Sequence, residues 1–139
     1  MEISKEKFNE LSFYTLAHPD TIYFIHQHIV DAYTTQTVDE TTKPISITFS
    51  LAGLYLYVEK NYSGRQVQQA HMKLSQTKKV WPEFEIPVHK GGITISNILT
   101  AAPGQERDLM IKEWCVSVWQ AYGNCHAMVA LLVKERLGV

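Results

Sequence analysis

Apolar residues recur at the spacing of an α-helix through most of the chain, with polar residues between them. The first helix is expected near residues 4–16. A second helix should begin after Pro19, with Asp20 or Thr21 as its cap, and should end near Thr35. The chain therefore opens as two consecutive amphipathic helices.

The second helix has a clear inward face when its residues are placed about 100° apart around the axis. His26 lies at the edge of that face, whereas Phe24, His28 and Asp31 lie on the opposite side. This arrangement predicts an exposed or capping role for Asp31. The inward face itself carries Ile22, Ile25, Ile29, Ala32, Tyr33 and Gln36.

A third helix is expected from the threonine-rich segment before Pro44 to about residue 60, with proline in its first turn. It is apolar nearly all round, which is typical of the most buried helix in a bundle. Ser63 and Gln66 then have the spacing of a capping box, which predicts a fourth helix from there to about residue 78.

The middle of the chain is irregular, because residues 81–87 contain two prolines that a regular helix does not accommodate. We expect an ordered loop here, pinned by Trp81 and Phe84. Residues 93–99 predict a brief helix capped by Thr94 or Ser96, with a short strand as the alternative.

Beyond Pro103 and Gly104 the apolar period stays in phase to the end of the chain, which predicts one long helix, kinked at Gly123. Both cysteines, Cys115 and Cys125, fall in this helix, where about 15 Å would separate their Cα atoms. A disulfide spans at most about 7 Å between Cα atoms. Both residues are therefore expected to be free thiols.

The pattern as a whole predicts an all-α fold: a single-domain bundle over residues 1–139, with about five to six helices and an irregular Pro/Gly loop before the long C-terminal helix. An apolar fraction of 45% is that of an ordinary globular protein. The formal charge of -1 argues against nucleic acid as a partner, and the sequence has neither a signal peptide pattern nor a long apolar segment. We expect a cytoplasmic protein that does not bind membranes, and self-association into a homo-oligomer is compatible with this composition.

The common catalytic and nucleotide-binding motifs are absent, and the candidate chemistry lies in six histidines. His26, His71 and His126 fall on three different predicted helices and could offer three imidazoles to one divalent metal, such as zinc or nickel. The alternative is that each is hydrogen-bonded within the core or at its rim, and this alternative is favoured because the spacing is not specific.

Three polar residues of the second helix are candidates for contacting a small-molecule ligand: Asp31, Tyr33 and Gln36. Tyr33 and Gln36 lie on the inward face, so their polar ends must find a partner in the backbone, in water or in a ligand. Trp114 and Trp119 share the spacing of a packed core and are assigned to it.

Residues 24–36 contain a His-x-x-x-x-Asp-x-Tyr-x-x-Gln pattern, and residues 114–126 contain a Trp-x-x-x-x-Trp helix with a later histidine. With these segments the chain resembles an uncharacterised bacterial family catalogued as a domain of unknown function. The placement of its histidines is more loosely similar to DinB-like helical bundles, a resemblance that implies three histidines holding a divalent metal.

Three function classes remain open at this stage. The first two are a domain that binds a small ligand and a domain that binds another protein, and together they rank above the third. The third is a metal-dependent hydrolase or transferase that uses His26, His71 and His126. The sequence itself does not specify a substrate, and the cofactor, if there is one, is expected to be the divalent metal.

Overall fold

The computed structural model describes residues 2–17 and 23–139. Over these residues the chain forms seven α-helices, one short 3-10 turn and no strand, so the all-α prediction is confirmed and the expected count of five to six helices is too low. None of the described helices has the length and apolarity needed to cross a membrane. In chain order the elements are α1 (Glu2–Ala17), α2 (Ile25–Gln36), α3 (Pro44–Lys60), α4 (Gly64–Ser75), α5 (Ile95–Thr100), α6 (Gln105–Ala121), the 3-10 turn η1 (Gly123–Cys125) and α7 (His126–Leu137).

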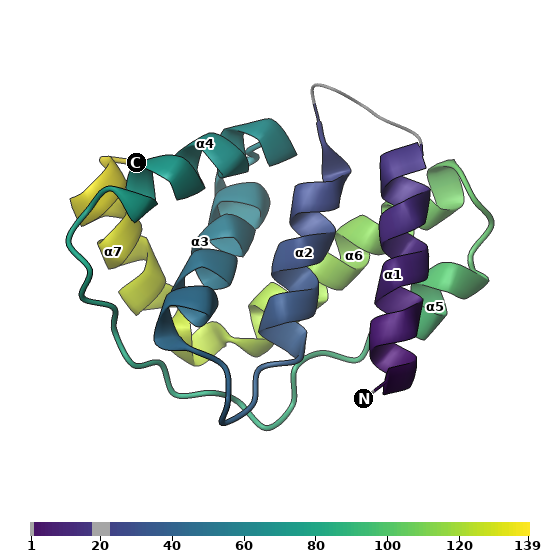
Figure 1. The fold of residues 1–139 in the computed structure, drawn as a ribbon, viewed down its shortest axis with the longest axis horizontal. Helices are drawn as coiled ribbons and strands as arrows, with labels where there is room; N and C mark the ends of the chain where they lie inside the picture. The colour runs from purple at the N-terminus through teal and green to yellow at the C-terminus, as the bar shows by residue number, and fades with distance from the viewer. Residues whose placement is uncertain (1, 18–22) are drawn as a thin grey trace.

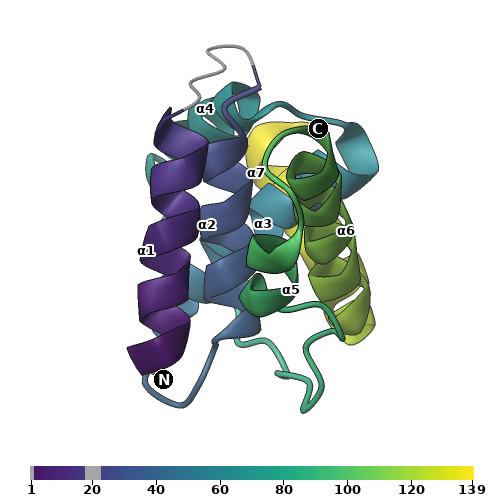
Figure 2. The same ribbon diagram turned by 90° about the vertical axis from the view of Figure 1, so that its right-hand side faces the viewer.

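Helices α1, α2 and α3 lie side by side in one layer, and α6 crosses behind α2 (Figure 1). The view turned by 90° places α5 and α6 together in a second layer (Figure 2). Helices α4 and α7 pack against α3 at the end of the bundle away from α1. Both α2 and α3 contact four other helices, so the central position expected for α3 is shared with α2.

The helix starts follow local signals in three of the predicted places: Thr94 is the N-cap of α5, as expected, and the other two are the starts of α4 and α3. The capping box is confirmed: the Ser63 hydroxyl accepts a hydrogen bond from the Gln66 N–H at 3.2 Å, and the Gln66 carboxamide accepts one from the Ser63 N–H at 2.8 Å. Pro44 opens α3 as expected, but its N-cap is Lys43, because Asp39 engages the preceding threonine hydroxyls instead. The expected cap of α2 at Asp20 or Thr21 lies outside the described residues.

The predicted single C-terminal helix is wrong, since α6 ends at Ala121 and α7 begins at His126. Two buried residues at the break explain it. The Tyr122 hydroxyl donates to the Thr35 carbonyl at 2.6 Å, and the Cys125 thiol lies 3.5 Å from the Glu85 carbonyl. The turn keeps both side chains in the core and lets α7 pack on α3 and α4. Both cysteines are buried and free.

The segment between α4 and α5 follows the lower edge of the bundle in Figure 1 and is held by side chains rather than by regular structure. Trp81 packs edge-on against Phe49, with ring centroids 5.4 Å apart, and the Arg136 guanidinium lies 4.8 Å from the Trp81 ring. Phe84 also packs against the core. The prediction of an ordered loop pinned by Trp81 and Phe84 is confirmed.

The two tryptophans assigned to the core are buried, with Trp114 at 0% and Trp119 at 1% exposure. Each indole N–H has a partner, as a buried polar group requires. Trp114 donates to the Gln36 carboxamide at 2.9 Å, and Trp119 donates to the Glu59 carboxylate at 2.8 Å. The indoles therefore fix α6 against α2 and α3.

Replacing Trp119 with alanine should lower the free energy of unfolding by about 3–5 kcal/mol, because a large buried ring is lost and the site does not fully collapse. Urea denaturation followed by circular dichroism measures the change. Phe13→Ala is the matched control, since Phe13 is 75% exposed and its loss should cost less than about 0.5 kcal/mol. Similar losses in the two variants would contradict the core assignment.

Candidate functional site

A pocket of ≈ 890 Å³ opens at the end of the bundle where α1 and α3 finish and where α2, α4 and α6 begin, the upper end in Figure 1. Its size lies within the range of about 300–1,000 Å³ that is usual for small-molecule sites. The lining combines aromatic rings with polar and charged ends: Tyr14, Thr15, Tyr23, Ile25, His28, Tyr57, Asn61, Tyr62, Ser63, Arg65, Gln66, Gly104, Asp108 and Lys112.

Two rings from the central helices form the floor of the pocket. His28 of α2 and Tyr57 of α3 are stacked, with centroids 3.6 Å apart and planes 12° from parallel. Burial lowers the pKa of His28 to about 4, so its imidazole is neutral at pH 7. Its Nδ1 is buried and has no hydrogen-bond partner in the described part of the chain. Burial also raises the pKa of Tyr57, so the phenol keeps its proton.

At one rim of the pocket, hydrogen bonds join α1 to the start of α6. The Tyr14 hydroxyl accepts from the Gly104 N–H at 2.9 Å and donates to the Asp108 carboxylate at 2.8 Å. The Arg107 guanidinium lies 4.7 Å from the centre of the Tyr14 ring. The single carboxylate of the described lining is thus already engaged within the protein.

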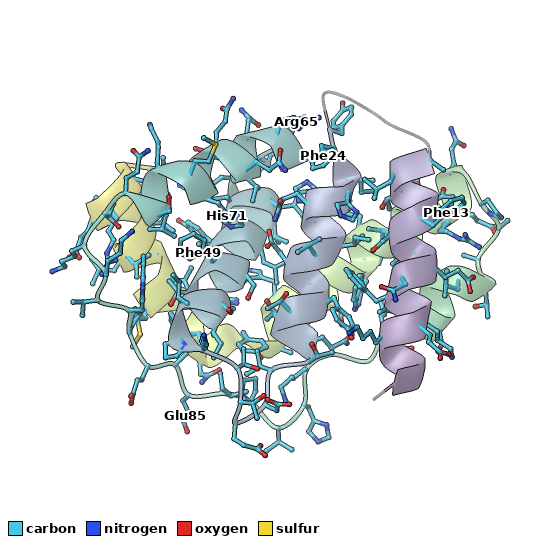
Figure 3. The ribbon with its side chains drawn as sticks, in the orientation of Figure 1. Phe13, Phe24, Phe49, Arg65, His71 and Glu85 are labelled. Carbon is cyan, nitrogen blue, oxygen red and sulfur yellow. The ribbon has the colours of Figure 1, made fainter. Side chains whose placement is uncertain are left out.

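The opposite rim is a close contact between the chain entering α2 and the start of α4. Phe24 has a left-handed φ of 45°, and a side chain on Gly64 would meet the Phe24 carbonyl oxygen at 1.9 Å. Only glycine allows this approach. The Arg65 guanidinium lies 4.2 Å from the Phe24 ring centroid and donates to Gln68 at 3.0 Å; Figure 3 shows Arg65 and Phe24 together at this rim.

Besides the His28 ring, four polar ends of the described lining make no hydrogen bond or ion pair with a described residue. They are the Lys112 ammonium, the hydroxyls of Tyr57 and Tyr62, and the Asn61 carboxamide. Each can donate a hydrogen bond. The pocket therefore contains unused donors above an aromatic floor.

Asp31 lies one turn along α2 from His28 and is buried, with 3% exposure. The Gln27 carboxamide donates to its Oδ1 at 3.2 Å, whereas its Oδ2 has no partner among the described residues. Burial raises its pKa well above the usual range, which favours the neutral acid. The expectation of an exposed or capping Asp31 is wrong, as is the outward placement of His28, because α2 is enclosed by neighbouring helices on several sides.

Gly53 of α3 makes room for this carboxyl. A Cβ atom at Gly53 would stand 2.0 Å from Asp31 Oδ2 and 3.2 Å from His71 Nε2. Both atoms therefore border the same point on α3. His71 does not use Asp31 as its partner, because its Nε2 lies 2.8 Å from the Phe49 carbonyl; Figure 3 shows the two residues together.

The structure does not bring His26, His71 and His126 together. His26 Nδ1 lies 3.0 Å from the Thr15 hydroxyl, and His126 Nε2 lies 2.7 Å from the Trp119 carbonyl. An imidazole nitrogen that donates to a carbonyl has no lone pair for a metal. Within residues 2–17 and 23–139, no three His, Cys, Asp or Glu side chains are grouped so that they could hold a metal ion.

The other residues singled out from the sequence hold the fold together, and none of Asp31, Tyr33 and Gln36 lies in the described lining of the pocket. Tyr33 stacks on Phe8 of α1, with centroids 4.2 Å apart. The Gln36 carboxamide donates to the Ile93 carbonyl at 2.8 Å while accepting from Trp114. Tyr33 thus packs against α1, and Gln36 joins α2 to α6 and to the segment before α5.

Sequence reasoning missed Tyr57, Tyr62 and Lys112 of the pocket. Tyr57 lies in a helix that the pattern marks as apolar nearly all round, and its hydroxyl, which needs a polar partner when it is buried, is the signal that could have singled it out. Lys112 carries no such signal, since it is one of many surface lysines until α6 places it at the pocket.

Gly53→Ala should destabilise the protein by about 1–3 kcal/mol, because the added methyl group meets the Asp31 carboxyl. In an Asp31→Ala background the same change should become neutral or stabilising, since alanine favours a helix by about 1 kcal/mol over glycine. Gly123→Ala is the control, because its Cβ would have nothing within 4 Å. Equal effects of Gly53→Ala in both backgrounds, by urea denaturation, would show that Asp31 does not set this contact.

Asp31→Asn should change the pH dependence of stability in a fixed direction. The raised pKa means that the folded protein holds a proton that the unfolded chain releases above about 3.8, so the free energy of unfolding falls as pH rises through that window. The lowered pKa of His28 makes the free energy of unfolding rise with pH below the ordinary histidine pKa of 6.5. This contribution is present in both proteins and cancels when their stabilities are subtracted. Wild-type stability minus Asp31→Asn stability, from urea titrations between about pH 4 and 8, should therefore decrease with pH and then level off. Parallel curves would refute a buried acid that stays protonated.

The comparisons with known proteins support the family resemblance and add no activity. A family model described as "Family of unknown function (DUF5946)" matches residues 5–123, a span that contains the whole described lining of the pocket. No curated protein and no solved structure matches the chain. The DinB-like resemblance stays a prediction. On the extent of the match, the chain belongs to the family of unknown function DUF5946.

Proposed function

We propose that this protein is a small-molecule-binding domain whose ligand lies in the pocket above the His28–Tyr57 stack. The observation that carries the proposal is the combination in one cavity of a flat aromatic floor with unused hydrogen-bond donors. Binding sites for small molecules are typically concave and largely apolar, with a few placed polar groups that orient the ligand.

The floor is suited to a flat ligand body. His28 and Tyr57 are neutral and stacked, and Ile25 adds an aliphatic wall beside them. Aromatic side chains bind rings by offset or edge contacts worth about 0.5–1.5 kcal/mol beyond the buried area. A planar or partly aromatic molecule would gain most from this surface.

Binding is a better account of the pocket than catalysis, because burial keeps the His28 ring neutral and the Tyr57 hydroxyl protonated. His28 remains neutral well below pH 7, which removes its function as an acid. Neither cysteine lines the pocket, and burial raises the pKa of both thiols. The described lining therefore lacks an activated nucleophile.

N-phenyl-1-naphthylamine, an uncharged aromatic probe whose fluorescence rises in apolar surroundings, should bind the wild-type protein saturably at one site. Ile25→Trp should weaken that binding at least about tenfold, since the larger ring fills the pocket. Ile45→Trp is the matched control, because Ile45 is 39% exposed and lies outside the described lining.

Tyr57→Leu gives a second variant, which removes the flat ring and should weaken binding about three- to tenfold. Circular dichroism and urea denaturation establish that each variant is folded. Absence of saturable binding to the wild-type protein, or an equal loss in Ile25→Trp and Ile45→Trp, would overturn the proposal.

A further inference from the structure

The unused polar ends of the pocket indicate which chemical class of ligand it accepts. This step rests on the proposed function, since it concerns the same cavity. We infer that the ligand carries an anionic group, a carboxylate, phosphate or sulfonate, which pairs with Lys112 while the rest of the molecule lies on the His28–Tyr57 floor.

The charged groups of the described lining differ in how far the protein already satisfies them. Asp108 accepts the Tyr14 hydroxyl at 2.8 Å. Arg65 packs on Phe24 and donates to Gln68. Lys112 makes neither a hydrogen bond nor an ion pair with any described residue, although it lines the pocket. The one charge on the described wall that has no protein partner is thus a cation, on an exposed lysine.

The neutral polar groups of the lining also favour an anionic ligand, because they are hydrogen-bond donors. The Tyr57 hydroxyl keeps its proton and has no partner among the described residues. The Tyr62 hydroxyl and the Asn61 amide also have no partner among the described residues. An anionic oxygen accepts several hydrogen bonds at once, and those bonds are stronger than bonds between neutral groups. One ligand head group could therefore use several of these ends.

Asp108 lies one helical turn from Lys112 on α6 and opposes an anion in the pocket. Its hydrogen bond to Tyr14 does not remove the negative charge. Asp108→Asn keeps a group that can accept from Tyr14 and should raise the affinity for an anionic ligand relative to the affinity for a neutral one. This variant tests the sign of the field in the pocket independently of Lys112.

The test compares two probes that share one ring system. 1-Anilinonaphthalene-8-sulfonate carries a sulfonate that N-phenyl-1-naphthylamine lacks. At low salt the wild-type protein should bind the sulfonate about tenfold more tightly, a ratio that shrinks as sodium chloride is added. Lys112→Gln should lower the affinity for the sulfonate far more than the affinity for the uncharged probe, so that most of this preference is lost. Lys134→Gln on α7, outside the described lining, is the matched control and should alter neither affinity.

Competition then separates the anion classes. Displacement of the bound sulfonate by benzoate or by phenyl phosphate supports the inference and shows which head group is preferred, whereas displacement only by uncharged benzyl alcohol overturns it. If the uncharged probe binds but the sulfonate has no advantage, or keeps it in Lys112→Gln, the anion inference fails while the proposed function stands. If neither probe binds saturably, the proposed function itself fails.

Discussion

The close contact between α2 and α3 sets the geometry on which the rest of the molecule depends. Gly53 has no side chain, so the Asp31 carboxyl fits against the α3 backbone, and a single methyl group there would overlap Oδ2. The same contact, one turn toward the start of α2, brings His28 over Tyr57 at 3.6 Å. The floor of the pocket is thus a direct consequence of how near the two central helices approach.

Helix α2 is unusual for a central helix because its buried positions include polar side chains. His28, Asp31 and Thr35 are each at most 3% exposed. Burying an unpaired polar group costs about 1–3 kcal/mol, so the unpartnered Oδ2 of Asp31 and Nδ1 of His28 lower the stability of the fold. Burial shifts both groups toward their neutral forms, which limits that cost. Of the two residues only His28 lines the pocket, where its neutral ring borders the space for the proposed ligand.

The fold was largely accessible from the sequence, and the site was not. Helical periodicity, Pro44 and the Ser63–Gln66 capping box are local signals, and the helices they predicted exist. The break between α6 and α7 depends on Tyr122 and Cys125 reaching partners far away in the chain, a tertiary effect that periodicity does not encode. The helical wheel misplaced Asp31 because it assumes one buried face, whereas α2 is enclosed on several. The pocket is lined by the ends of separate helices, so no short segment of the sequence contains its set of residues. The residues singled out by spacing, Tyr33 and Gln36, instead connect α2 to neighbouring parts of the fold.

The most direct test of this account is an NMR titration of the ring protons of His28, assigned with a His28→Gln variant, with and without N-phenyl-1-naphthylamine. If the α2–α3 contact holds the imidazole neutral on Tyr57 at the pocket floor, the His28 protons should titrate with a pKa near 4, and the probe should shift their resonances while the His126 resonances stay unchanged. A His28 that titrates near its ordinary value of 6.5 and does not respond to the saturating probe would contradict the account.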